Sequence, residues 1–203
     1  MFTGLVQHVG RIASIEPSPA GRRLTIDPAG WDHHPAPGDS ICVSGCCLTV
    51  VTADGRGWAF DVVPETLAKT TLGGLARGSR VNLEHAATPT TLLGGHMVQG
   101  HVDGVAAVSR VQSGDDWRVE FRPPADLMAC VIPKGSVCID GVSLTLARVE
   151  PAAGVFEVAL IPTTLEKTTL ADLKVGQGVN VEPDAVVKAI VHVLRHFGSQ
   201  PQV

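Results

Sequence analysis

The chain has 203 residues, of which 44% are hydrophobic and 18% charged, and its formal net charge at pH 7 is −4. This composition is too apolar for a disordered chain, and no apolar run is long enough for a membrane-spanning helix. Because Lys and Arg are not clustered and residues 1–4 show no leader pattern, we expect a cytoplasmic protein that binds neither nucleic acid nor membranes.

Short apolar runs along the first half of the chain predict β-strands. They cover residues 6–15, 23–26, 40–52, 58–63 and 79–84, with turn-forming Gly, Pro and Asp residues between them. Before the last of these runs, residues 64–75 predict a short helix or turn. The 22 glycines and 14 prolines likewise favour strands and tight turns over long helices.

The second half of the chain repeats the first. Residues 45–50 return 96 positions later as residues 141–146, and residues 64–72 return 98 positions later with seven of nine residues identical. The chain therefore contains two copies of a unit of about 90 residues, each long enough for one small hydrophobic core. Five or six strands per copy suit a small closed barrel, which leaves no sheet edge exposed.

The residues after the second copy predict an amphipathic helix. Asp184 is a candidate N-cap, Val187, Ile190, Leu194 and Phe197 follow at helical spacing, and Gly198 ends the pattern. So short a helix is not stable alone in water. Its apolar stripe must therefore pack either on the barrels or on helices of other subunits.

The five cysteines are an odd number, so we expect reduced thiols. Cys47 has Ser143 as its repeat partner, and either side chain can act as a nucleophile, although a small buried residue is the alternative. For the other four we expect burial: Cys42, Cys46, Cys130 and Cys138.

His96 and His101 are the sharpest local polar feature. Together with Cys46 and Cys47 they raise the question of zinc, but the spacing matches no standard zinc module, so we expect no metal. A hydrogen-bonded strand histidine is the alternative for His96. The Thr-rich segments at 64–72 and 162–170 either cap helices or present hydroxyls to a polyhydroxylated or heterocyclic ligand.

Several motifs together indicate a family. They are Met-Phe-Thr-Gly at residues 1–4, Gly-Cys-Cys-Leu-Thr-Val at 45–50, Glu-Thr-Leu at 65–67, Gly-Gly-His-x4-His at 94–101, Lys-Gly-Ser at 134–136, Ile-Asp-Gly-Val-Ser-Leu-Thr at 139–145 and Leu-Ile-Pro-x-Thr-Leu-Glu at 160–166. Through them the chain resembles the riboflavin synthase alpha-chain family, whose members have two lumazine-binding barrels. The resemblance implies an all-β fold of two tandem homologous six-stranded Greek-key β-barrels, over residues 1–92 and 93–183, with a C-terminal oligomerisation helix and tail over 184–203.

The family's reaction is implied in the same way. It is the last step of riboflavin biosynthesis, a dismutation of two 6,7-dimethyl-8-ribityllumazine molecules into riboflavin and 5-amino-6-(D-ribitylamino)uracil by transfer of a four-carbon unit. The resemblance implies no metal and no cofactor. It further implies a homotrimer, in which the first barrel of one subunit faces the second barrel of a neighbour, and allows an association with lumazine synthase.

Two lumazine sites are implied position by position. The first comprises Gly4, Leu5, Val6, Cys47, Leu48, Thr49, Asp61, Val62, Val63, Pro64, Glu65 and Thr66. The second comprises Gly100, His101, Val102, Lys134, Ser143, Leu144, Thr145, Ala159, Leu160, Ile161, Pro162, Thr163 and Thr164.

The catalytic roles are a hypothesis. We take Cys47 or Ser143, or a water that either positions, as the nucleophile and His101 as the proton-transfer group. Supporting residues complete the set, with Asp184 and His96 as polar groups and Phe2 packed over the ligand. The alternative is a non-catalytic lumazine- or flavin-binding protein of the same fold. Such proteins typically have a degenerate second site, whereas this chain keeps His101, Lys134, Ser143 and Thr145.

Overall fold

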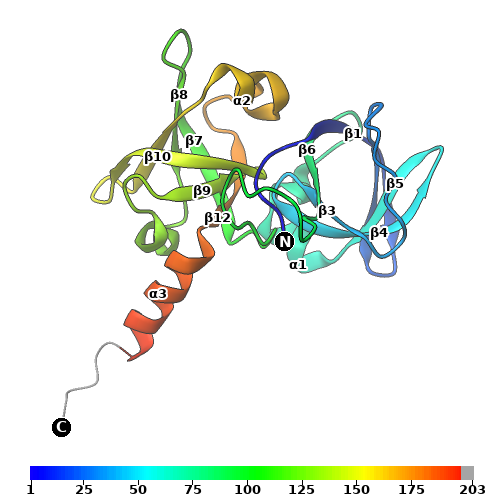
Figure 1. Cartoon of the computed structure of the whole chain (residues 1–203), viewed down its shortest axis with the longest axis horizontal. Helices are drawn as coiled ribbons and strands as arrows, with labels where there is room; N and C mark the ends of the chain where they lie inside the picture. The colour runs from blue at the N-terminus through cyan, green and yellow to red at the C-terminus, as the bar shows by residue number, and fades with distance from the viewer. Residues whose placement is uncertain (198–203) are drawn as a thin grey trace.

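The computed structural model describes residues 1–197 and contains two closed β-barrels, with one helix extending from the second (Figure 1). All strand pairs within the barrels are antiparallel. Within the described residues, no helix has the length and apolar character needed to cross a membrane.

Barrel 1 is built from the first copy of the repeat. Its strands are β1 (His8–Ser18), β2 (Gly21–Asp27), β3 (Ser40–Val43), β4 (Cys46–Asp54), β5 (Gly57–Val62) and β6 (Arg80–His85). Their order around the barrel is β1-β2-β5-β4-β3-β6. Because β2 pairs with β5 rather than with β3, the connections are those of a Greek key. Between β5 and β6 lie α1 (Pro64–Lys69) and the 3-10 helix η1 (Thr71–Gly74), as the sequence predicted.

Barrel 2 repeats this arrangement. Its strands are β7 (Gly104–Gln112), β8 (Arg118–Arg122), β9 (Ser136–Ile139), β10 (Val142–Glu150), β11 (Val155–Ala159) and β12 (Gly178–Pro183). Their order is β10-β11-β8-β7-β12-β9, and the shorter elements are η2 (Ala125–Cys130), α2 (Pro162–Lys167) and η3 (Thr169–Asp172). The predicted fold class, two six-stranded barrels, is confirmed.

The sequence predicts one strand over residues 40–52, but the structure has two strands there. These form a hairpin of β3 and β4, because Ser44 and Gly45 both adopt left-handed backbone conformations, with φ of 44° and 85°. Asp140 and Gly141 make the same turn in barrel 2, with φ of 45° and 81°. Two consecutive left-handed residues match the twist of a tight hairpin, and this turn supplies the sixth strand.

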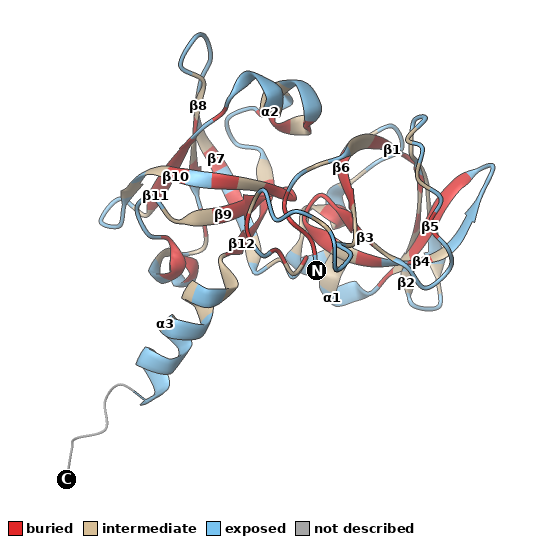
Figure 2. Cartoon of the chain, in the orientation of Figure 1, coloured by how far each residue is buried: buried red, intermediate tan, exposed pale blue. Residues whose placement is uncertain are grey.

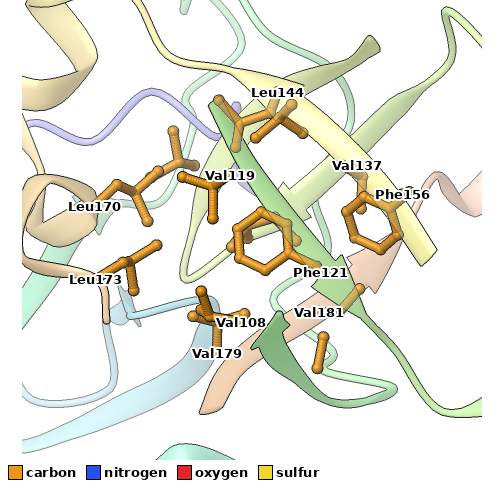
Figure 3. Packing of buried hydrophobic residues seen from close by; sticks show 14 of the residues in the cluster. Val108, Val119, Phe121, Val137, Leu144, Phe156, Leu170, Leu173, Val179 and Val181 are labelled. Carbon is orange, nitrogen blue, oxygen red and sulfur yellow. The ribbon is translucent and has the colours of Figure 1, made fainter. Parts of the chain in front are cut away.

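Each barrel is filled by the inward-facing residues of its strands. In barrel 2 the rings of Phe121 and Phe156 meet at a centroid distance of 5.5 Å, surrounded by aliphatic side chains (Figure 3). Along β4 the alternation is plain, since Leu48 points into the core while Thr49 is exposed. A shift of one residue would reverse every side chain, so this burial fixes the register.

The segments that precede the two barrels cross between them. Phe2 and Val98 form an antiparallel bridge in which each N–H donates to the other's carbonyl oxygen, at 2.8 and 3.1 Å. The Phe2 ring is buried in a small cluster with Cys42, Val98 and Cys138. The N-terminus accordingly lies between the barrels (Figure 1).

Two equivalent asparagines tie the barrels together. Asn82 in β6 donates its side-chain amide to the Asp140 carbonyl oxygen at 2.8 Å, and its side-chain oxygen accepts the Thr169 N–H at 2.8 Å. Asn180 in β12 makes the matching bonds to Ser44 and Thr71, both at 2.7 Å. Each barrel thus satisfies buried backbone groups of the other.

The predicted C-terminal helix is present as α3 (Ala185–Phe197). None of its residues is buried (Figure 2). Ile190, Leu194 and Phe197 are 54–66% exposed. Its charged side is fixed by Lys188, which pairs with Asp103 at 2.7 Å. Val187 is half-buried, and within this chain the barrels leave the rest of the apolar stripe uncovered. Gly198, where the predicted helix ends, and the tail after it lie outside the described residues.

Candidate functional site

The repeat produces two related clefts. The first, called the Cys47 cleft, has a volume of about 360 Å³ and is lined by Cys46, Cys47, Glu65, Thr66, Lys69, Thr70, Gly100, His101 and Val102. The second, called the Ser143 cleft, measures about 250 Å³ and is lined by Gly4, Leu5, Val6, Val142, Ser143, Thr163, Thr164, Lys167 and Thr168. Each combines the start of a barrel strand, a short helix of the same barrel and a segment from the other copy.

This construction corrects the predicted grouping of residues. The grouping implied by the family resemblance placed Gly4 with Cys47 and Gly100 with Ser143, each pair within one copy. The structure exchanges them: the Gly4 carbonyl oxygen accepts the Ser143 N–H at 2.7 Å, and the Gly100 carbonyl oxygen accepts the Cys47 N–H at 2.8 Å. The reason is that each leading segment passes over the other barrel before it enters its own first strand.

Glycine is required at both crossing points. Gly4 and Gly100 have φ of 74° and 79°, in the left-handed region that side chains disfavour. A Cβ atom at either position would lie 2.6 Å from the Cβ of Ser143 or Cys47. The close approach of backbone to strand therefore sets one wall of each cleft.

Two buried carboxylates bind the same two segments through hydrogen bonds. Glu84 accepts hydrogen bonds from the Thr3 N–H, the Thr3 hydroxyl and the Gly4 N–H at 2.7, 2.6 and 3.0 Å. Glu182 accepts the N–H groups of Gln99, Gly100 and His101 at 2.7–2.9 Å. Burial raises the pKa of both carboxyl groups, and the hydrogen bonds oppose that rise.

The two candidate nucleophiles have different surroundings. Cys47 is the one cysteine of the five that is not buried; burial raises the pKa of Cys46 to about 12. Ser143 instead lies next to a histidine, with its Oγ 2.7 Å from Nδ1 of His96. His96 is 8% exposed, and burial lowers its pKa while the charge of Asp184 partly opposes the shift. His96 is therefore neutral at pH 7.

The remaining proposed catalytic residues lie at the edges of this arrangement. Asp184 caps α3, where its carboxylate accepts the Val186 N–H at 2.8 Å, as the sequence predicted for the helix N-cap. His101 is exposed in the Cys47 cleft. The Phe2 ring, expected over the ligand, is 1% exposed and lies between the barrels rather than in a cleft lining.

Comparison with known proteins identifies the family of the chain. The model of the lumazine binding domain family matches residues 3–86 and 99–184. A riboflavin synthase from Mycobacterium tuberculosis is 43% identical over 202 residues, which are 98% of this chain and 100% of the relative. One from Escherichia coli is 39% identical over 194 residues, covering 94% of this chain and 90% of the relative. The chain belongs to the riboflavin synthase family.

A solved structure of similar fold contains a bound lumazine. LumP complexed with 6,7-dimethyl-8-(1'-D-ribityl) lumazine matches with a TM-score of 0.80 at 29% identity, covering 90% of this chain and 99% of the LumP chain. Riboflavin synthases match at higher identity. The family membership therefore makes the chain an enzyme and does not favour the non-catalytic alternative.

Several residues that the family resemblance implied lie outside both cleft linings. Four of them, Leu48, Val62, Leu144 and Leu160, are buried in the barrel cores. Asp61 pairs with Arg23 at 2.9 Å. The others in this group are Thr49, Val63, Pro64, Lys134, Thr145, Ala159, Ile161 and Pro162.

Sequence reasoning missed six cleft residues. Two are Cys46, which was expected only to be buried, and its repeat partner Val142. The other four are Lys69 and Thr70 and their partners Lys167 and Thr168. They belong to the segment that is nearly identical in the two copies, so the repeat itself was the available signal. Within residues 1–197, no group of three or more His, Cys, Asp and Glu side chains is arranged to hold a metal ion.

Proposed function

We propose that this member of the riboflavin synthase family binds one 6,7-dimethyl-8-ribityllumazine in the Cys47 cleft and another in the Ser143 cleft and transfers a four-carbon unit between them. The observation that carries the proposal is the pair of related but chemically different clefts. Holding both reactants in a fixed orientation lowers the barrier by roughly 7–11 kcal/mol. Riboflavin and 5-amino-6-(D-ribitylamino)uracil together contain all atoms of the two lumazines, so the transfer needs no outside oxidant or reductant.

The Ser143 cleft takes the acceptor lumazine. Neutral His96 accepts the proton of the Ser143 hydroxyl across the 2.7 Å contact, and the serine oxygen, or a water that it holds, attacks the ligand ring. His96 becomes cationic in this step. The negative charge of nearby Asp184 stabilises that cation, which gives Asp184 its supporting role.

The Cys47 cleft takes the donor lumazine. His101 lies exposed in this cleft and removes the acidic proton from the 7-methyl group of the ligand. The hydroxyls of Thr66 and, in the other cleft, Thr164 bind the ribityl chains. Cys47 contacts the donor ring through its half-buried thiol.

The active assembly is a homotrimer in the cytoplasm. The two clefts have no lining residue in common, and in the proposed homotrimer a cleft of one subunit faces the other cleft of a neighbour. Exposed apolar residues occur as repeat pairs, Met1 with Met97 and Val63 with Ile161, and α3 adds its uncovered stripe. These surfaces support self-association. An association with lumazine synthase stays a prediction.

One assay tests the reaction. Purified protein is mixed with 6,7-dimethyl-8-ribityllumazine, and riboflavin is followed by its absorbance, with heat-unfolded protein as the control. We expect about one riboflavin for every two lumazines consumed, because the second lumazine becomes the uracil product. Lumazine binding without any riboflavin would leave only a carrier function.

A further inference from the structure

Glu84 and Glu182 lie outside both cleft linings, yet each contacts the segment that forms a cleft wall. They are 3% and 2% exposed, and each carboxylate receives three hydrogen bonds from its segment. A carboxylate suits this place because both oxygens only accept, whereas an amide would direct an NH₂ group at backbone N–H donors. The mechanism proposed above uses neither side chain.

Because the segments cross, each carboxylate binds a segment that contacts the other barrel. Glu84 belongs to barrel 1, but the segment it holds ends at Gly4, whose carbonyl oxygen binds the Ser143 N–H of barrel 2. Glu182 belongs to barrel 2, but its segment runs through Gly100, whose carbonyl oxygen binds the Cys47 N–H of barrel 1. His101 follows directly on that segment.

We infer that Glu84 and Glu182 are positioning residues, each of which fixes the wall of the cleft on the opposite barrel. Glu84 fixes the Ser143 cleft, and Glu182 fixes the Cys47 cleft together with the main chain of His101. The inference deepens the proposed function and rests on it for its catalytic meaning. Its geometry can be tested without turnover.

The natural thiol of Cys47 reports on its cleft. Because the other four cysteines are buried, iodoacetamide alkylates Cys47 first, and peptide mass mapping gives its rate. Glu182→Gln releases the wall beside Cys47, and we expect the rate to rise roughly fivefold or more. Glu84→Gln, although it is in the same barrel as Cys47, should leave the rate within about twofold.

The reciprocal measurement uses a thiol introduced by Ser143→Cys. In that background Glu84→Gln should raise alkylation at position 143, and Glu182→Gln should not. Glu157→Gln is the matched control, because Glu157 is equally buried at 3% exposure but binds arginines on barrel 2 and touches neither segment. It should change neither rate.

Failure of the proposed ligand site and failure of the positioning role give different results. Riboflavin as the probe should protect Cys47 from alkylation in the unmodified protein and in Glu84→Gln, but only at roughly tenfold higher concentration in Glu182→Gln. If riboflavin protects nothing, the proposed ligand site is wrong, while the alkylation rates still test the positioning role. Equal effects of both substitutions on both thiols, or no effect, overturn the inference. If a glutamine variant does not fold, the aspartate variant is measured in the same way.

Discussion

The contact between His96 and Ser143 has no counterpart at Cys47 among the cleft contacts described. The two strand positions are repeat partners, and both accept a crossing segment, yet only Ser143 has a histidine nitrogen within 2.7 Å. Burial keeps that histidine neutral at pH 7 because the charged form is desolvated. In the proposed mechanism, this asymmetry assigns different steps to two similar clefts that bind identical substrates.

A pH profile tests the role of His96. Its pKa lies below 6.5, so the neutral form persists at pH 7, and turnover should decline only as the pH falls below 6.5. His96→Gln should lower kcat by about 100-fold and move the midpoint of this acidic limb. His33→Gln is the control, since burial also lowers the pKa of His33, on barrel 1, outside both cleft linings. An acidic limb that survives unchanged in His96→Gln argues against the proposed base.

At the scale of elements, α3 has an apolar side that is largely uncovered within one chain. Its exposed apolar residues lie on one side of the helix, as the spacing predicted, and its polar contacts with barrel 2 are made by Lys188 and Arg195. A helix this short gains most of its stability from packing. The uncovered stripe is therefore best explained by contact with other subunits.

A charge placed on this stripe tests the trimer. Leu194→Glu should convert trimers to monomers in analytical ultracentrifugation, because each Leu or Ile buried in an interface contributes about 1.5–3 kcal/mol. Removal of residues 184–203 should do the same and leave little activity. His192→Glu, on the opposite side of α3, should keep the trimer. Trimers that persist in Leu194→Glu would refute the role of the helix.

At the scale of the whole molecule, the barrels meet through crossed contacts between repeat partners. The turns at Gly45 and Gly141 lie back to back, so that a Cβ atom on either would come within 3.0 Å of the other's backbone N. The turn residues differ in charge: Ser44 is neutral, whereas the buried carboxyl of Asp140 has its pKa raised by desolvation to about 7. The side-chain carboxyl of Asp140 accepts one hydrogen bond, from the Asn180 N–H.

This carboxyl makes stability depend on pH. The folded pKa is about 7 against an ordinary value of 3.8, so folding is penalised increasingly as the pH rises between these values. Asp140→Asn removes the penalty, and its gain in unfolding free energy should grow from near zero at pH 4 to as much as about 4 kcal/mol at pH 8. Urea unfolding at both pH values measures the gain. Asp115→Asn, at an exposed carboxylate, should change little at either pH, and a constant gain for Asp140→Asn would contradict the argument.

The amino-acid sequence by itself determined the two-barrel fold, the short helices before the last strands and the capped C-terminal helix. These features follow from local periodicity, turn residues and the repeat, which act over a few positions. The hairpin turn at Ser44 and Gly45 also had a local signal in the sequence. The second copy has Asp140-Gly141 at the same position, and an Asp-Gly pair favours a two-residue hairpin turn.

Only the tertiary structure decided which residues share a cleft. The crossing of Gly4 to Ser143 and of Gly100 to Cys47 joins positions that are far apart in the chain, and nothing in either copy's local pattern specifies the exchange. The contact between Ser143 and His96 is decided in the same way. Such contacts arise because two half-buried surfaces satisfy each other's backbone groups, which is a property of the packed pair and of neither copy alone.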